Sequence, residues 1–181
     1  MKKLITFLFL ITSLSSAFAH SPYGQWDTFR SRYLQIVTNK LDTEGDKLGE
    51  EIADTLRKDL PASRALVSRA PNVERIASLL YTDQVKVAVI SHKDLKELLA
   101  IEDFKNSPIS ILLDNGTYFV VARNDLPAYH GYLISKTLYD NKWLRFKEPE
   151  KNKSGLVIHP GTTAMLKGQV PAYQESAKHD H

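Results

Sequence analysis

SRALVSRAPNVERIASLLYTDQVKVAVIS (63–91) contains two strand patterns separated by one helix pattern. Its two ends, 63–70 and 85–91, are the strand patterns, and the second is rich in β-branched residues. Asn72 suits a helix N-cap, because its side chain can accept a hydrogen bond from a backbone N–H of the first turn. The apolar face of the helix comprises Val73, Ile76, Ala77 and Leu80. This order predicts a βαβ unit with its two strands in a parallel sheet.

The segments on both sides extend the alternation. YLQIVT (33–38) is an apolar run typical of a buried strand. Residues 42–60 predict a helix with an acidic first turn, which suits the positive end of a helix dipole. Its apolar residues at four-residue spacing are Leu48, Ile52, Leu56 and Leu60. HKDLKELLAIEDF (92–104) predicts a third helix, so the order is β-α-β-α-β-α.

The pattern changes after Pro108. ISILLDNGTYFVVAR (109–123) has two apolar runs on either side of Asn115 and Gly116. This pair predicts a β-hairpin, because both residue types accept positive φ. The alternative is a single strand that crosses between two lobes.

A further helix is predicted over 126–143, with Pro127 in its first turn. The residues along one of its faces are Tyr129, Leu133, Lys136 and Tyr139 or Asp140. LVIHPGTT (156–163) then predicts a strand that ends at a corner, because a residue before proline is restricted to extended backbone. Thr162 or Thr163 is the expected N-cap of the final helix. We interpret His159 as a residue that shapes this corner, not as a catalytic or ligand-contacting histidine.

The ends of the chain differ from its body. MKKLITFLFLITSLSSAFA (1–19) has a basic start, an apolar stretch and an Ala-x-Ala site, and it predicts a cleaved signal peptide. The processed chain would begin at His20, lie in the periplasm or be secreted, and not insert into a membrane. The expected fold is α/β, a single three-layer lobe with a mainly parallel sheet, a β-hairpin and a carboxyl-terminal helical segment. One domain would cover 20–173, and 174–181 would form a disordered tail.

Composition excludes several classes of function. The chain of 181 residues has no cysteine, which rules out disulfides and cysteine-based zinc sites. Its formal charge of +3 falls to +1 without Lys2 and Lys3, so a nucleic-acid partner is not expected. The sequence contains no nucleophile elbow, phosphate loop or zinc-protease motif, and we therefore expect a protein that is not an enzyme.

Three stretches carry a family resemblance. ARNDLPAYHGYLISKTLYDN (122–141) is similar to a segment in which a strand ends in an acidic-x-Pro turn before a tyrosine-containing helix. LVIHPGTTAMLKG (156–168) and SRAPNVERIASLLYTDQVKVAVIS (68–91) are similar to further strand and helix segments of the same family. The chain thus resembles the TAXI group of TRAP transporter solute-binding subunits. This resemblance implies a periplasmic-binding-protein-like lobe that binds a solute, in a reduced version lacking most of the second lobe.

A ligand site is expected where the parallel strands end, because open α/β sheets bind ligands beside the carboxyl ends of their strands. The residues at these positions are Thr38, Asn39, Arg69, Asn72, Ser91 and His92. Arg69 could hold a small carboxylate in a bidentate way. Alternatively, Asn72 only caps its helix and Arg69 only lies on the surface. The nearby Asp42, Glu44 and Asp46 either favour a cation or complement the helix dipole.

Copper is the only cofactor that the sequence suggests. His20 would become the amino-terminal residue, and its α-amine and imidazole together could chelate copper. A second imidazole would come from His92, His130 or His159. The other interpretation is that the protein has no cofactor and that histidine is merely permitted after the cleavage site.

Three hypotheses follow. The first is an exported, non-enzymatic solute-binding or accessory protein, whose partner is a small organic anion or a periplasmic or membrane protein. The second is a periplasmic copper protein that uses His20. The third is an interaction module without a small ligand.

Overall fold

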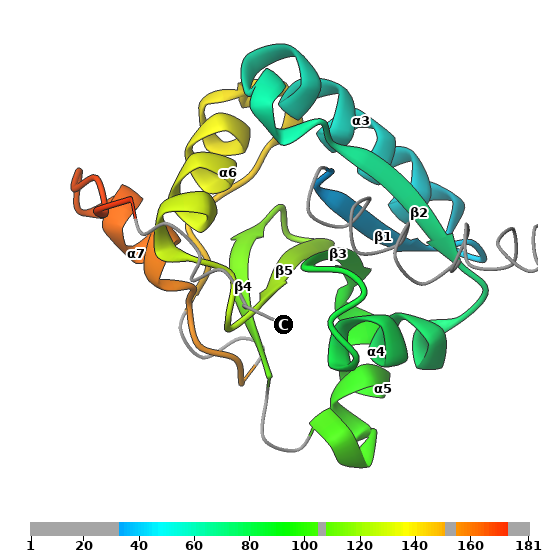
Figure 1. Cartoon of the computed structure of the whole chain (residues 1–181). Helices are drawn as coiled ribbons and strands as arrows, with labels where there is room; N and C mark the ends of the chain where they lie inside the picture. Colours follow the sequence, from blue (N-terminus) through cyan, green and yellow to red (C-terminus); the bar gives the residue numbers. More distant parts are fainter. Residues whose placement is uncertain (1–32, 105–107, 151–154, 174–181) are drawn as a thin grey trace, which may run out of the picture. The chain divides into compact units, whose positions relative to one another are not determined.

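The computed structural model describes residues 33–104, 108–150 and 155–173 (Figure 1). The predicted signal peptide, the metal position at His20 and the predicted tail lie outside these residues. The described residues, which begin at Tyr33, belong to one compact unit. Among the described residues, no helix is both long and apolar enough to cross a membrane.

Strands and helices alternate as far as α5, as the sequence predicts. The strands are β1 (Gln35–Asn39), β2 (Leu66–Ala70), β3 (Val87–Ser91), β4 (Ile109–Asp114) and β5 (Tyr118–Arg123). The α-helices are α3 (Thr43–Asp59), α4 (Val73–Tyr81), α5 (His92–Ala100), α6 (Ala128–Asp140) and α7 (Pro160–Leu166). Short 3-10 turns are η1 (Pro61–Ser63), η2 (Glu102–Phe104) and η3 (Lys142–Leu144).

The described strands form one mixed sheet in the order β2-β1-β3-β5-β4. β1 pairs in parallel with β2 and β3, whereas β5 is antiparallel to both β3 and β4. The expected α/β lobe is therefore confirmed, with its parallel pairs on one side of the sheet. The hairpin between β4 and β5 is also confirmed, and the alternative of a strand crossing between lobes is wrong.

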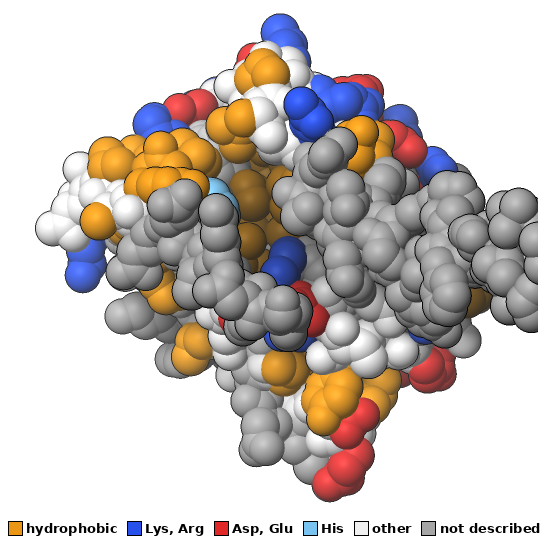
Figure 2. Space-filling view, in the orientation of Figure 1, with side chains coloured by type: hydrophobic (Ala, Val, Ile, Leu, Met, Phe, Trp, Pro, Cys, Tyr) orange, Lys and Arg blue, Asp and Glu red, His pale blue; other side chains and the backbone are white. Residues whose placement is uncertain are grey.

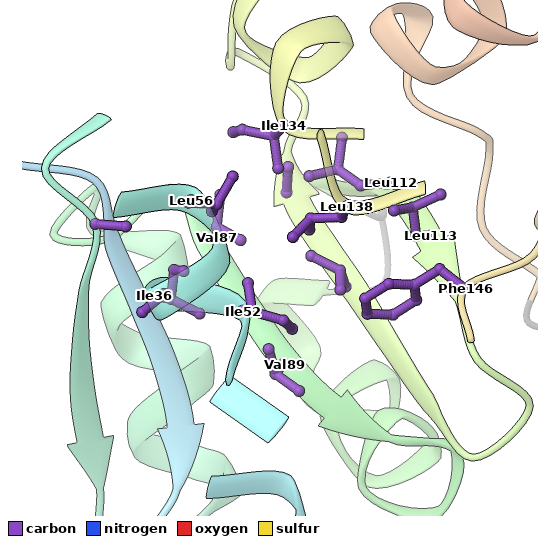
Figure 3. Packing of buried hydrophobic residues seen from close by; sticks show 14 of the residues in the cluster. Ile36, Ile52, Leu56, Val87, Val89, Leu112, Leu113, Ile134, Leu138 and Phe146 are labelled. Atoms are coloured by element: carbon purple, nitrogen blue, oxygen red, sulfur yellow. The ribbon is translucent and has the colours of Figure 1, made fainter. Parts of the chain in front are cut away.

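Helices cover both faces of the sheet (Figure 1). On one face, Ile36, Val87 and Val89 pack in a core with residues of α3 and α6, as Figure 3 shows. On the other face, Val37 and Ala88 pack in a second core with residues of α4 and α5. Consecutive strand residues thus enter opposite cores, because side chains alternate along a strand. The sheet therefore lies between two layers of helices, which is the predicted three-layer arrangement.

The hairpin turn is held by side chains of its own residues. The Asn115 side-chain oxygen accepts the N–H groups of Thr117 (3.0 Å) and Tyr118 (2.8 Å). Gly116 has φ +94°, which favours glycine, whereas Asn115 does not take positive φ. The loop therefore uses only one of the two positions at which the sequence permits this conformation.

The carboxyl-terminal helices differ from the prediction in three ways. Pro127 precedes α6 as its N-cap instead of lying in its first turn. The buried face of α6 contains Gly131 and Ile134, next to the stripe that the sequence indicates. Thr162 and Thr163 do not cap α7, because that helix already begins at Pro160 and the side chain of His159 caps it.

Candidate functional site

The carboxyl ends of β1 and β3 lie side by side at one edge of the sheet, since these strands are parallel neighbours. From β1 the chain continues into α3 on one face, and from β3 it continues into α5 on the other. Ligands of open α/β sheets bind at such a switch point. We call this region the β1–β3 edge. It contains Thr38, Asn39, Ser91 and His92, together with Arg69, which lies opposite Thr38 on the neighbouring strand β2.

On the β1 side, Asp46 connects two of the predicted site residues. Its carboxylate accepts hydrogen bonds from Thr38 Oγ1 and from Arg69 Nε, both at 2.8 Å. Arg69 Nη2 also donates to Glu50 Oε1 at 2.7 Å. The hydrogen bond to Asp46 and its charge, followed by the hydrogen bond to Glu50, raise the pKa of Arg69. Arg69 is therefore positioned by two carboxylates, while its side chain remains 46% exposed.

Thr38 is fully buried, and it limits the size of the α3 side chain that can lie against it. A Cβ added to Gly49 would overlap with Thr38 Cγ2, so the close approach of α3 to β1 requires a glycine. The helix and the strand consequently hold Asp46 and Thr38 in fixed relative positions.

On the β3 side, Asn39 links β1 to α5. Its Nδ2 donates to Asp94 Oδ2 at 3.0 Å, and its Oδ1 accepts the N–H of Leu41 at 3.0 Å. Ser91 caps α5, because its Oγ accepts the N–H of Asp94 at 3.0 Å. The Asn39 side chain is thus held by the Leu41 backbone and by Asp94, while the backbone of Asp94 is held by Ser91.

His92 forms a third pair, with Asp114 at the end of β4. His92 Nε2 lies 3.0 Å from Asp114 Oδ1, and the imidazole stacks on Phe119 with ring centroids 4.0 Å apart. A carboxylate accepts, so His92 Nε2 is the donor in this pair. Asp114 is buried, and it also accepts the N–H of Gly116 at 2.7 Å. This geometry fixes the ring while leaving the His92 side chain 27% exposed.

Sequence reasoning missed Tyr118, which completes the edge. Its hydroxyl donates to Asp42 Oδ1 at 2.8 Å, and Asp42 also caps α3 by accepting the N–H of Gly45. Burial first, and then the hydrogen bond to Asp42, raise the pKa of Tyr118. Tyr118 lies here because β5 pairs with β3 in a register that sets it opposite Ser91. No local pattern shows that pairing.

Asn72 lies outside these networks. Its side-chain oxygen accepts the N–H of Arg75 at 2.9 Å, so it caps α4 as the sequence predicts. Among the described residues, no hydrogen bond links it to the other predicted site residues. The structure therefore connects Thr38 with Arg69 through Asp46, and Asn39 with Ser91 through Asp94. His92 directly follows Ser91 in the chain, and Asn72 serves as a helix cap.

The two other histidines that the structure describes, His130 and His159, have surroundings different from those of His92. Within the described ranges, no group of three His, Asp or Glu side chains is arranged to hold a metal ion. His159 is fully buried, with Nδ1 accepting the N–H of Gly161 (3.0 Å) and Nε2 facing the carbonyl of Leu126 (3.1 Å). His130 lies among the rings of Tyr129 and Tyr173. Copper binding at His20 stays a prediction.

The predicted corner at His159 is part of a buried junction between α6 and α7. A Cβ added to Gly131 would overlap with the His159 ring, and one added to Gly161 would overlap with the backbone of α6. Thr162 Oγ1 donates to the carbonyl of Leu112 at 3.0 Å, so Ser135 Oγ donates to Thr162 Oγ1 across 2.7 Å. We call these contacts the α6–α7 junction, and they give His159 a structural role.

A comparison with models of known protein families found no match, and a comparison with curated proteins found none either. The resemblance to TAXI subunits therefore stays a prediction that depends on the sequence segments alone.

Proposed function

We propose that this protein is an exported, non-enzymatic solute-binding or accessory protein whose ligand site is the β1–β3 edge. The observation that carries the proposal is the convergence of Thr38, Asn39, Ser91 and His92 at the switch point of the sheet. Fixed carboxylates hold each of these side chains except Ser91, which is fixed as the cap of α5. Ligand sites are usually preformed and contain a few precisely placed polar groups, and this edge provides such groups.

A small carboxylate is the ligand class that suits this edge best. Arg69 already binds two carboxylates, and they differ in exposure: Asp46 is 23% exposed and Glu50 is 42% exposed. Exposed ion pairs contribute little to stability, so a solute carboxylate can replace Glu50 at small cost. Asp46 would continue to orient the guanidinium through Nε. A planar guanidinium suits this exchange because it can bind a carboxylate through two parallel N–H groups.

Thermal unfolding with small organic acids tests the proposal. A ligand present at 100 times its Kd stabilises the folded state by about 2.7 kcal/mol, which raises the melting temperature by several degrees. We expect Arg69→Ala to abolish this rise. Arg75→Ala, at an exposed arginine of α4, is the matched control and should keep it. The proposal is wrong if no acid raises the melting temperature, or if Arg69→Ala retains the full rise.

A protein partner that presents a carboxylate is a second candidate, and the exposure of Leu41 favours it. Leu41 is 78% exposed, and its N–H donates to Asn39 in the same edge. A partner would cover this apolar side chain, whereas a small acid bound at Arg69 would not need it. We therefore expect Leu41→Asp to prevent partner binding and to leave any stabilisation by small acids unchanged.

A further inference from the structure

We propose that the end of α3, together with η1 and η3, docks on an anionic phospholipid surface. The residues of this surface, which we call the basic corner, are Lys58, Arg64, Lys142, Trp143 and Arg145. The proposal does not depend on the ligand site, which lies at the other end of α3.

Contacts within the fold bring the parts of the basic corner together. Asn141 Nδ2 donates to Asp59 Oδ2 at 3.0 Å, which holds the start of η3 beside the end of α3. Leu144 of η3 is buried in the same core as Leu56 of α3. Arg64 follows η1, the turn that begins directly after α3. Figure 2 shows Lys and Arg side chains beside hydrophobic ones over this end of α3, at the top of the view.

The basic corner has an excess of positive charge. Nearby Arg57 pairs with Asp54, and Lys136 pairs with Asp140. The four basic side chains of the corner form no ion pair within the part of the chain that the structure describes. Asp59 is a neighbouring carboxylate, and it already accepts from Asn141. The dipole of α3 explains a cation at Lys58, near the end of that helix. It does not explain Lys142 and Arg145, which follow α6.

Trp143 distinguishes a lipid surface from a simple polyanion. Its side chain belongs to the exposed hydrophobic residues, at 55%, and its indole N–H already donates to Asn141 Oδ1 at 3.2 Å. The ring is therefore fixed with its polar atom satisfied. Tryptophan is enriched at the level of lipid headgroups, where an apolar ring and nearby Lys and Arg stems both find a suitable environment. Charge complementarity and this ring together favour an anionic membrane surface.

Docking at this corner would leave the ligand edge accessible. α3 begins beside Tyr118 and ends at the basic corner, and its 17 residues span about 25 Å. The β1–β3 edge would consequently face away from a membrane that contacts the corner.

Vesicle flotation tests the proposal, with protein recovered from expressing cells in its processed form. Vesicles contain equal parts phosphatidylglycerol and phosphatidylcholine, or phosphatidylcholine alone. We expect binding to the anionic vesicles only, and loss of binding in about 1 M salt, where screening acts within about 3 Å. Each removed basic residue should weaken binding about fivefold. Lys142→Glu combined with Arg145→Glu should therefore abolish binding, and Trp143→Ala should reduce it.

The matched control reverses two exposed charges elsewhere, Lys96→Glu with Lys167→Glu, which changes the net charge equally. It should retain most of the binding, and circular dichroism should show that every variant is folded. Equal binding to both vesicle types, or equal loss in the control pair, overturns the proposal. The proposal is also overturned if polyglutamate displaces the protein completely and Trp143→Ala does not alter binding. An acidic macromolecule would then be the partner.

Discussion

The β1–β3 edge and the α6–α7 junction both consist of polar groups in fixed geometry, but they differ in access to water. At the junction, His159 and Thr162 are fully buried, and their side chains form hydrogen bonds to other protein groups. At the edge, Arg69 and His92 keep part of their side chains exposed. Buried polar groups cannot exchange partners without a large cost, whereas exposed ones can. We therefore expect substitutions at the junction to change stability and substitutions at the edge to change binding.

The largest effect should come from His159→Ala. This change leaves a cavity and removes the partners of the Leu126 carbonyl and the Gly161 N–H, so we expect a loss of about 3–5 kcal/mol in the free energy of unfolding. Urea denaturation measures this loss. A loss below about 1 kcal/mol would show that the junction does not depend on the imidazole.

Gly131→Ala should be the next most damaging change. The added methyl group would overlap with the His159 ring, and overpacking of this kind costs about 1–3 kcal/mol. A double-mutant cycle with His159→Ala provides the control, because removal of the ring relieves the overlap. The two losses should then sum to more than the loss in the double variant. Strict additivity would contradict the contact.

Stability should also depend on pH through His159. Burial lowers the pKa of His159 in the folded state, so the unfolded state takes up the proton first as the pH falls. The free energy of unfolding is unaffected above the unfolded pKa of about 6.5 and decreases as the pH drops below it. Denaturation at several pH values, compared between the wild type and His159→Gln, isolates this contribution. An equal pH slope in both proteins would contradict the assignment.

The smallest changes in stability are expected at the β1–β3 edge. Asn39→Ala removes a partly buried hydrogen bond to Asp94 and should cost about 1 kcal/mol. Arg69→Ala should leave the melting temperature nearly unchanged, because its ion pairs are exposed. A loss at Arg69 as large as that at His159 would remove the distinction between the two regions.

The sequence indicated the elements because their causes are local. Of the predicted stripe, Leu48 to Leu56 are buried and Leu60 packs partly buried against the same core, and Asn72 caps α4 as predicted. The contacts between elements could not be predicted from local patterns. Gly131 carries no pattern of its own, yet its lack of a side chain makes room for His159.

The candidate site shows the same limit. Thr38, Asn39 and Ser91 were identifiable because they lie where strands end in the chain. Tyr118 was not, because its position depends on β5 pairing with β3. The acidic partners of the site residues could not be predicted either, because they also depend on strand pairing. In the sequence Asp46 is an ordinary acidic residue of a first helical turn, and only the register of β1 and β2 brings Arg69 to it.

The affinity of a small carboxylate for the Glu50→Gln variant tests the central claim most directly. If a solute replaces Glu50 on Arg69, removal of the competing charge should tighten binding about two- to fivefold, as measured by calorimetric titration. Arg69→Ala should show no binding in the same titration. Equal affinity in the wild type and Glu50→Gln, or retained binding in Arg69→Ala, would contradict a carboxylate site at the β1–β3 edge.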